Sequence, residues 1–513
     1  MAHDPATLPD ALLRPEAYPH TPDHVEFHQT HVSWVYVAGD LVYKLKRPVC
    51  FPFVDYSTLE RRRHFCEEEV RLNRRTAPDT YRGVVRVVRR SDGSLAIGGN
   101  DESGEVVEYA VEMERLPAEG MLDYRLKNGL ATREEILRIA DALIAFHRNC
   151  PTGPGVNEYA TPEKVRETFD KTIAIARAHL APVFADRIEK HVANALNLKL
   201  LHRRIKQARI RDGHGDLHAG NICFSSDGAP ILYDCIEFDP ALRCGDVAAE
   251  IAFLAMDLCR YGHADWSRQF ILRYAIPTGD LELRELAALY AIRRALVRAN
   301  VTNILAQETG DAETVAAARL YRQLAAAYAL PPAVIAMCGP PASGKSRIAE
   351  AIARPLRAEV VRSDVERKRL SGMEPTERWR GAVDGGPYRA ELTQNTYGLL
   401  IQRAREETAA ERSVVLDATY SDPGQRARLL AACPTTSVVF VWVDTEEEKR
   451  RARSAARERD PAAVSDARAE IFEQLTAHFR PPVELTATQC VKVNGAAPPD
   501  EAVHALLHNL AAR

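Results

Sequence analysis

Residues 339–346 read Gly-Pro-Pro-Ala-Ser-Gly-Lys-Ser, a complete G-x-x-x-x-G-K-[ST] pattern that decides the fold of the C-terminal part of the chain. They follow residues 334–338, Val-Ile-Ala-Met-Cys, an apolar run short enough to be one buried strand. In such a loop the backbone N–H groups turn toward the phosphates of a nucleotide, the lysine adds a charge, and the serine hydroxyl can hold Mg²⁺. The alternative is a glycine-rich turn with an exposed lysine. The strand before the pattern favours nucleotide binding, and we expect the binding residues to be Gly339, Pro340, Pro341, Ala342, Ser343, Gly344, Lys345, Ser346 and Arg347.

A second phosphoryl-transfer signature lies far upstream, where residues 214–221 read His-Gly-Asp-Leu-His-Ala-Gly-Asn. In a protein-kinase-like catalytic loop, H-x-D-x-x-x-x-N supplies an aspartate that receives the proton of the substrate hydroxyl. Five residues later the same pattern supplies an asparagine that holds Mg²⁺. Here these residues are Asp216 and Asn221. After a turn signal at residues 225–228, the strand 230–233 ends in Asp234, where a kinase places its second metal ligand.

The composition indicates globular domains. The 513 residues are 46% apolar and 27% charged, and this length suggests about two to four domains. The N-terminus lacks a basic region with an apolar core, and no apolar run approaches the ~18 residues of a membrane span, so we expect a cytoplasmic protein. Ten scattered cysteines without a C-x-x-C pattern favour reduced thiols over disulfides or a zinc site. A net charge of −3 disfavours a large nucleic-acid footprint.

The first 115 residues are predicted to be rich in strands, with one helix. Residues 31–37 and 41–46 alternate in polarity and are separated by Ala38-Gly39-Asp40, a hairpin signal. Residues 60–75 read as a helix with a thin apolar stripe. Another strand is expected at residues 105–116. This organisation is that of a small lobe.

A lysine and a glutamate of this small lobe are candidates for orienting phosphates. In kinases, a lysine on the third strand pairs with a helix glutamate and orients the α- and β-phosphates. Lys44 and Lys46 share one face of the second predicted strand, and glutamates 67–69 belong to the predicted helix. We prefer Lys44 with Glu68 or Glu69 and take Glu69 as the candidate. The alternative for any one of these glutamates is a solvated charged face.

Residues 116–328 are predicted to form a helical lobe. Thr132 and Glu135 make a capping box before a helix of regular apolar periodicity, and long helical stretches follow at residues 162–208 and 246–328. Pro331-Pro332 then marks the end of this helical region, and strands are expected to alternate with helices after it. We therefore expect one domain at residues 1–328, with lobes of about 1–115 and 116–328, and a second domain at residues 332–513.

These motifs resemble those of known kinase families. Residues 214–221 with Asp234 resemble the aminoglycoside-phosphotransferase-like branch of the protein-kinase-like fold. Residues 42–48 and 69–75 are similar to an uncharacterised bacterial subfamily in which such a domain is fused to a P-loop kinase, and this similarity covers essentially the whole chain. The sequence departs from the kinase pattern in one respect: near the first hairpin it has no G-x-G-x-x-G loop to cover the nucleotide, and only Gly39 occurs there. The resemblance implies a bilobal α+β kinase-like fold that binds ATP and Mg²⁺.

The second domain resembles small P-loop kinases of the polynucleotide-kinase, gluconate-kinase and zeta-toxin type. Strands are expected at residues 333–338, 359–363, 413–417, 437–443 and 490–494, with helices between them and hence a parallel sheet. In the kinases it resembles, an aspartate after the second strand accepts the substrate proton, and an arginine three residues later contacts the substrate or the transferring phosphate. The resemblance assigns these roles to Asp364 and Arg367. The alternative for Asp364 is a helix cap.

Two further features of this domain bear on transfer. Asp417 ends a Walker-B-like strand and suits the Mg²⁺ shell, and Ala418 follows it rather than a glutamate that could orient water, which favours transfer to an organic acceptor over hydrolysis. Residues 449–457 are rich in arginine, where related kinases carry a lid. Arg453 and Arg457 would share a helix face and neutralise transition-state charge. A solvated helix with acidic partners at residues 446–448 explains the run equally well.

Two functions remain open at this point. The first is a tandem kinase in which both domains move a γ-phosphoryl group from ATP to hydroxyls of small molecules. The second is a catalytic P-loop domain that is regulated by a kinase-like sensor of nucleotide or ligand. Action on nucleic-acid 5′ ends is a third, weaker reading, since one arginine run alone suggests a groove for a strand. The intact Asp216, Asn221 and Asp234 favour the tandem kinase. The acceptor and the oligomeric state cannot be predicted from the sequence.

Overall fold

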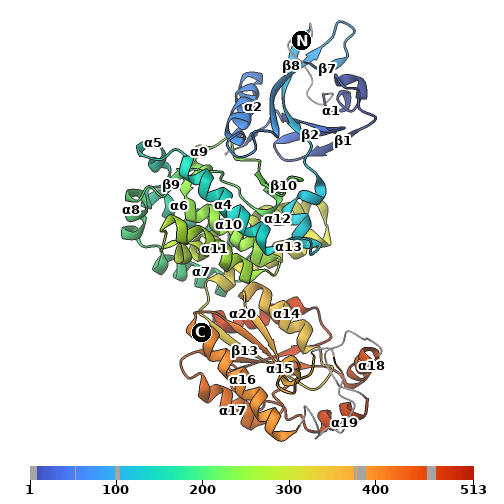
Figure 1. Ribbon diagram of the computed structural model, residues 1–513, viewed down its shortest axis with the longest axis vertical. Helices are drawn as coiled ribbons and strands as arrows, with labels where there is room; N and C mark the ends of the chain where they lie inside the picture. Colours follow the sequence, from blue (N-terminus) through green and yellow to red (C-terminus); the bar gives the residue numbers. More distant parts are fainter. Residues whose placement is uncertain (1–7, 52–53, 99–103, 375–376, 378–388, 459–468) are drawn as a thin grey trace. The chain divides into compact units, whose positions relative to one another are not determined.

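The computed structural model describes residues 8–51, 54–98, 104–374, 377, 389–458 and 469–513 (Figure 1). The chain forms two compact units. The first comprises Met1–Thr168, Leu196–Tyr261 and Asp265–Tyr290, and the second comprises Phe169–Ala195, Gly262–Ala264 and Ala291–Arg513. Within the described residues, no helix combines the length and the apolar composition that crossing a bilayer requires.

The first unit begins with a six-stranded antiparallel sheet in the order β1-β2-β3-β8-β6-β7. Helix α2, Leu59–Asn73, packs through Cys66 and Val70 on one face, and the short α1, Leu8–Ala11, covers the other. The predicted hairpin joins β2 and β3 in the expected register, with Ala38 opposite Leu41. The strands are β1 Val25–Gln29, β2 Ser33–Ala38, β3 Leu41–Lys46, β6 Tyr81–Arg89, β7 Leu95–Gly98 and β8 Glu105–Glu114, with a short pair β4 Cys50–Phe51 and β5 Val54–Asp55.

The rest of the first unit is mostly helical, as predicted. The capping box at the start of α4, Arg133–Asn149, is present, with Thr132 and Glu135 each bonded to the other's backbone N–H. Short strands carry the catalytic-loop motif: β9 Ile210–Asp212 pairs with β12 Cys244–Asp246, and β10 Ile222–Phe224 forms a hairpin with β11 Pro230–Leu232. The helices are α3 Leu122–Lys127, α4, α5 Pro154–Asn157, α8 Leu198–Lys206, α9 Pro240–Arg243, α10 Val247–Arg260 and α11 Ala264–Thr278.

The second unit is built on a five-stranded parallel sheet in the order β14-β15-β13-β16-β17. The strands lie where the sequence predicts them: β13 Ala333–Cys338, β14 Glu359–Arg362, β15 Val414–Asp417, β16 Ser437–Asp444 and β17 Cys490–Asn494. Every residue of β13 is buried, because helices cover both faces of a parallel sheet. Helices α14 and α20 pack on one face, α16 and α17 on the other (Figure 1). The helices are α14 Lys345–Leu356, α15 Ser363–Leu370, α16 Ala390–Ala409, α17 Pro423–Ala432, α18 Glu447–Glu458, α19 Ala469–Ala477 and α20 Pro499–Ala511.

Helices upstream of Pro331 also belong to the second unit. Phe184 of α7, Pro182–Ala195, and Ala326 and Ala327 of α13, Ala312–Tyr328, are buried in the same apolar cluster as α14 and α20. Arg357, at the end of α14, lies over the ring of Tyr328 at 3.7 Å. Helices α6 Pro162–Ala176 and α12 Leu283–Thr309 contribute residues to both units. The packing therefore assigns to the P-loop unit some helices that the sequence boundary at residues 331–332 leaves with the kinase-like domain.

Candidate phosphoryl-transfer sites

The loop that carries the kinase-like motif is held from beneath by α10. His214 is fully buried, and burial lowers its pKa. The N–H groups of His214 and Gly215 both donate to Glu250 Oε1, at 2.5 and 2.7 Å, and the N–H of Ala219 donates to Asp257 Oδ2 at 3.0 Å. Glu250 and Asp257 are two turns apart on one helix. Together they fix both ends of the loop that presents Asp216.

Glu250 is itself held by a buried hydrogen-bond chain. Its Oε2 lies 2.5 Å from His147 Nε2, and His147 Nδ1 lies 2.7 Å from the hydroxyl of Tyr274. Burial opposes ionisation of this carboxyl, but the hydrogen bond and charge of His147 and the Gly215 N–H outweigh it and lower the pKa of Glu250 to about 2. The anchor is therefore a carboxylate, which makes stronger bonds to N–H groups than a neutral acceptor does.

The structure places Asp216 and Asn221 just before the β10–β11 hairpin and Asp234 just after it. The Asn221 amide donates to the Asp216 backbone carbonyl at 2.9 Å and approaches its Oδ2 at 3.4 Å. The Tyr233 N–H donates to the Asn221 carbonyl at 3.1 Å, which places the next residue, Asp234, beside Asn221. Asp234 has a positive φ of 62°, an uncommon backbone conformation that concentrates at functional sites.

The small-lobe lysine reaches this hairpin. Lys44 Nζ lies 2.6 Å from Asp234 Oδ1 and 2.9 Å from Glu69 Oε1. Glu68 instead pairs with Arg71 on the exposed side of α2 at 2.7 Å. Of the two glutamates left open by the sequence, Glu69 is the one that contacts Lys44. The alternative of a solvated face holds for Glu68 but not for Glu69, which is completely buried.

The candidate residues of the second unit gather at the carboxyl ends of the parallel strands. Gly344 begins α14 with φ 101°, and Lys345 folds back on the loop, where its Nζ donates to the carbonyls of Gly339 and Pro340 at 3.0 and 2.8 Å. The Gly339 N–H donates to the carbonyl of Thr419 at 3.1 Å, which joins the loop to the end of β15. Phosphates commonly bind where a strand leads through such a loop into a helix.

Asp417 and Asp364 lie beside this loop. Asp417 is buried; burial raises its pKa, while a hydrogen bond from Ser346 and the charge of Lys345 act in the opposite direction. Asp364 lies in the first turn of α15, and Arg367 Nη1 approaches its Oδ1 at 3.3 Å. Helix α15 has Arg362 at its N-cap and no side-chain cap bond, so Asp364 does not cap the helix. The predicted proton acceptor and its arginine are therefore adjacent.

The arginines of the predicted lid contact backbone carbonyls near the loop. Arg453 donates to the carbonyls of Ser343 and Gly495 at 3.1 and 3.0 Å, and Arg347 also donates to Gly495 at 3.2 Å. A Cβ at position 495 would collide with the carbonyl of Ser343, so glycine permits this close approach. The geometry places Arg453 at the P-loop but on its backbone. The side chain of Arg457 lies outside the described residues.

Both sites present donors that suit Mg²⁺, which prefers oxygen ligands and keeps several waters. Asp234 and Asn221 provide a carboxylate and an amide, and Asp417 and Ser346 provide a carboxylate and a hydroxyl. Burial disfavours the charged form of a carboxyl such as Asp417, and a nearby cation stabilises that charged form. Within the described ranges, no group of three or more His, Cys, Asp or Glu side chains is arranged so that it could hold a metal ion.

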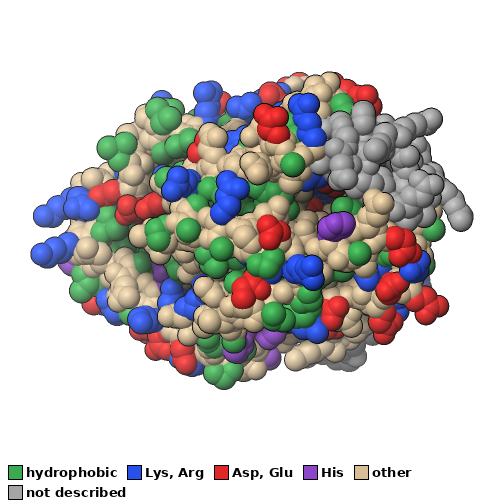
Figure 2. All heavy atoms as spheres, turned by 90° about the horizontal axis from the view of Figure 1, so that it is seen from below, with side chains coloured by type: hydrophobic (Ala, Val, Ile, Leu, Met, Phe, Trp, Pro, Cys, Tyr) green, Lys and Arg blue, Asp and Glu red, His purple; other side chains and the backbone are tan. Residues whose placement is uncertain are grey.

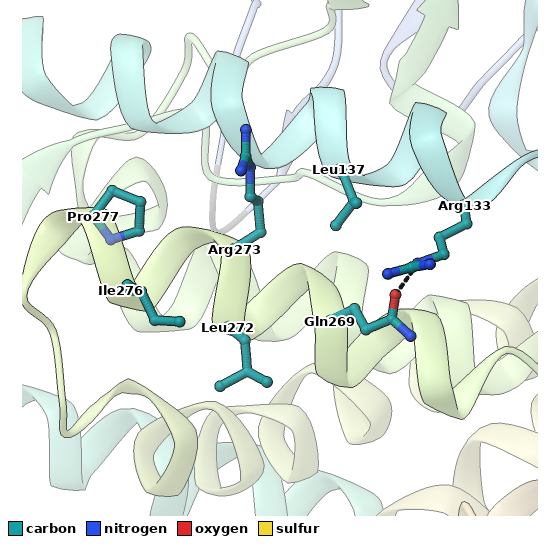
Figure 3. A pocket seen from close by; sticks show the side chains of 7 residues that line it. All are labelled: Arg133, Leu137, Gln269, Leu272, Arg273, Ile276 and Pro277. Carbon is teal, nitrogen blue, oxygen red and sulfur yellow. Dashed lines mark hydrogen bonds between the residues drawn. The ribbon is translucent and has the colours of Figure 1, made fainter.

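One pocket lies apart from these residues. It runs between α4 and α11, where Arg133 donates to Gln269 and where Leu137, Leu272 and Ile276 line the wall (Figure 3). Helix α11 contributes exposed leucine and isoleucine side chains to it. None of the candidate phosphoryl-transfer residues lines this pocket.

Two family profiles match the chain. The profile described as the phosphotransferase enzyme family matches residues 66–289, and the one described as an AAA domain matches residues 334–482. The molecule thus joins a kinase-like phosphotransferase domain to a P-loop kinase domain, and the expected fold class and domain types are confirmed.

Relatives extend the match over nearly the whole chain. Uncharacterized protein Rv2004c of Mycobacterium tuberculosis (strain ATCC 25618 / H37Rv) is 30% identical over 474 residues, which cover 90% of this chain and 92% of that protein. Uncharacterized protein Mb2027c of Mycobacterium bovis matches to the same extent. The chain belongs to the same family as these relatives.

Solved structures resemble each half. A choline/ethanolamine kinase family protein from Mesorhizobium loti has a TM-score of 0.39 and 13% identity, covering 63% of this chain and 95% of that one. A gluconokinase from Sinorhizobium meliloti 1021 has a TM-score of 0.27 and 20% identity, covering 35% of this chain and 93% of that one.

Sequence reasoning missed the residues that support the kinase-like site. The sequence of α10 did hold a signal, because Glu250 and Asp257 are the two acidic residues of an otherwise mostly apolar helix. In the structure, every side chain from Val247 to Cys259 is buried. Charged side chains are rarely buried unless they are paired. Glu237, which contacts Lys46, gave no signal, since its partner is 191 residues away in the chain.

Proposed function

We propose that the protein is a tandem ATP- and Mg²⁺-dependent phosphotransferase, in which each unit transfers a γ-phosphoryl group to a hydroxyl of a small molecule. The observation that carries the proposal is the contact of Lys44 with Asp234, because it brings the small-lobe lysine to the hairpin of Asp216 and Asn221. The membership of both domains in phosphotransferase and kinase families supports it.

In the first unit, Asp216 accepts the proton of the acceptor hydroxyl. The anchored loop holds its backbone in place, so the carboxylate needs no rearrangement before reaction. Asn221 and Asp234 would hold Mg²⁺, and Lys44 would contact phosphate oxygens. When bound, Mg²⁺ neutralises charge on the transferring phosphoryl group.

In the second unit, residues 339–347 bind the phosphates of ATP, and Lys345 leaves its own loop carbonyls to contact them. Ser346 and Asp417 would hold the metal. Asp364 accepts the acceptor proton, and Arg367 contacts the acceptor or the moving phosphate. Arg453 positions the loop through Ser343, and Arg457 remains a candidate for the lid.

We infer small-molecule acceptors rather than nucleic acid from the charges of one face of the molecule and of the arginine-rich run. On the face drawn in Figure 2, lysine and arginine side chains are interspersed with aspartate and glutamate. A groove that tracks a nucleic-acid backbone would gather positive charge along one path. Arg451, in the arginine-rich run of α18, pairs with Glu447 at 2.7 Å.

The test silences each site in the full chain and measures ATP consumption with pooled sugars, nucleosides, aminoglycosides and polyols. With Lys345→Ala, we expect Mg²⁺-dependent transfer to some acceptor to persist, and to vanish when Asp216→Asn is added. Suppose instead that Lys345→Ala abolishes all transfer while ATP still binds upstream and alters P-loop activity in the intact protein. The kinase-like domain is then a sensor, and the tandem proposal is wrong.

A further inference from the structure

Glu69 binds two lysines rather than one. Lys46 lies two residues after Lys44 on β3, and its Nζ donates to Glu69 Oε2 at 2.5 Å and to Glu237 Oε1. The hydroxyl of Tyr56 also donates to Glu237 Oε1, at 2.7 Å. Lys46 therefore joins the third strand, helix α2 and the segment that follows Asp234.

The two lysines differ in access. The Lys46 side chain is 2% exposed, and Glu69 and Glu237 are 0% and 5% exposed, whereas Lys44 is 17% and Asp234 43% exposed. A ligand that approaches from solvent can thus contact Lys44 but not Lys46. Among the described residues, the carboxylate partners of Lys46 all lie inside the protein.

The hydrogen bonds divide in the same way. Lys44 Nζ donates to Asp234 Oδ1 at 2.6 Å and lies 2.9 Å from Glu69 Oε1. Lys46 makes the shorter contact with Glu69, to Oε2 at 2.5 Å. Burial disfavours ionisation of Glu69, but the charges of Lys44 and Lys46 outweigh it and lower the pKa of Glu69 to about 2.

The charges explain why a second lysine is needed. Two ammonium groups face three carboxylates, those of Glu69, Asp234 and Glu237. When Asp234 serves as a metal ligand and Lys44 turns toward phosphate oxygens, Glu69 loses a cation while it stays buried. An uncompensated buried carboxylate is strongly destabilising, so a single lysine would be held back by Glu69.

We propose that Lys46 is a positioning residue that keeps Glu69 compensated and α2 in place, so that Lys44 is available to nucleotide phosphates. This inference rests on the proposed function of the kinase-like site. The role of Lys46 is exerted through Glu69, and Lys46 does not touch the nucleotide.

The experiment measures binding of Mg²⁺ with a non-hydrolysable ATP analogue by calorimetry, in the full chain carrying Lys345→Ala. Lys46→Met should weaken binding by at least about fivefold, since coupled neighbours interact by amounts of this order. Adding Glu69→Gln to Lys46→Met removes the charge that retains Lys44, and binding should then be no weaker than with Glu69→Gln alone. A purely structural role would instead give additive losses.

Glu108→Gln is the matched control. Glu108 is a buried carboxyl in the same lobe, paired with Arg62 at 2.7 Å, and it takes no part in the site. Its replacement should lower the melting temperature and leave analogue affinity within about twofold of the parent, because Glu108 pairs with Arg62 rather than with either lysine.

The outcomes are separable. If the Lys345→Ala chain binds no analogue, the proposed function of the kinase-like site fails, and the inference fails with it. If the analogue binds and Lys46→Met binds as tightly as the parent, the inference alone is overturned. Should Lys46→Met not fold, the double variant decides: affinity within about twofold of Glu69→Gln supports the proposal, and a further loss of about fivefold overturns it.

Discussion

The P-loop site takes most of its candidate phosphate-binding residues from one continuous stretch, whereas the candidate kinase-like site is assembled from segments that range from Lys44 to Asp257. In the P-loop, Lys345 contacts carbonyls five and six residues before it. In the kinase-like site, Lys44 contacts an aspartate 190 residues away. The first site depends on local backbone conformation, and the second on long-range ion pairs in a buried setting.

This difference predicts how each site fails. A substitution in the P-loop site should impair binding or transfer and leave the fold intact, because among the described residues Lys345 and Asp364 are not part of a large buried ion-pair network. A substitution in the buried network of the kinase-like site should disturb binding, stability and chemistry together, because its members share partners.

The largest effect is expected for Asp364→Asn. Transfer by the P-loop site should fall about 10² to 10⁴-fold, the usual worth of a general base, while ATP affinity remains nearly unchanged. Lys345→Ala should lose both binding and transfer. Calorimetry and turnover on the two variants test this pair, and an equal loss of ATP affinity in both would remove the proton-acceptor role of Asp364.

Glu250→Gln should next show the cost of disturbing the buried network. We expect the free energy of unfolding to fall by about 1–3 kcal/mol, since buried N–H groups lose a charged acceptor, and transfer at the kinase-like site to fall as well. Chemical denaturation and turnover in a Lys345→Ala chain measure the two effects. Unchanged stability would show that the loop does not depend on this carboxylate.

Glu250 should also make the stability of the folded protein depend on pH. Its pKa is about 2 in the folded protein against a usual 4.5, so its contribution is present above pH 4.5 and is lost as the pH falls toward 2. Glu69 contributes over the same range. Glu250→Gln should therefore flatten the loss of stability between pH 5 and about 2 relative to the parent. Parallel curves for the two proteins would contradict the assignment.

Truncation tests how the P-loop unit is delimited. We propose that residues 1–328 and 332–513 each fold, and the packing adds that a fragment from Asp311, which caps α13, should be more stable than one from residue 332. The longer fragment keeps Ala326 and Ala327 in the apolar cluster. Its melting temperature should be higher by roughly 4–8 °C, the shift that about 2 kcal/mol produces in a domain of this size. Equal melting temperatures would show that α13 does not stabilise the P-loop unit.

The smallest effect is expected for Glu68→Gln. Its partner Arg71 is exposed and three residues away, so stability should change by no more than about 0.5 kcal/mol, and nucleotide affinity should not change. Glu69→Gln, one residue further, should alter both. If the two substitutions behave alike, Glu69 has no special relation to the lysines of β3.

Much of the fold could be predicted because the signals are local. Alternating polarity marked β2 and β3, the capping box marked α4, and apolar runs marked all five strands of the parallel sheet. Asp216 and Asn221 precede the β10–β11 hairpin and Asp234 follows it, so their spacing sufficed to bring them together.

What the sequence could not show depends on packing between distant segments. The choice of Glu69 over Glu68 follows from which side of α2 faces the sheet, and the second lysine contact follows from the depth of Glu69. Likewise, the amphipathic character of α7 and α13 indicates a buried face but not which unit buries it, and the structure places both against α14 and α20.

The most direct test of the central claim counts nucleotide sites by calorimetry with Mg²⁺ and a non-hydrolysable ATP analogue. The intact protein should bind two analogue molecules, Lys345→Ala should retain only the kinase-like site, Asp234→Asn should retain only the P-loop site, and the double variant should bind none. A single site in the intact protein, or loss of both sites in either single variant, would contradict the existence of two separately built phosphoryl-transfer sites.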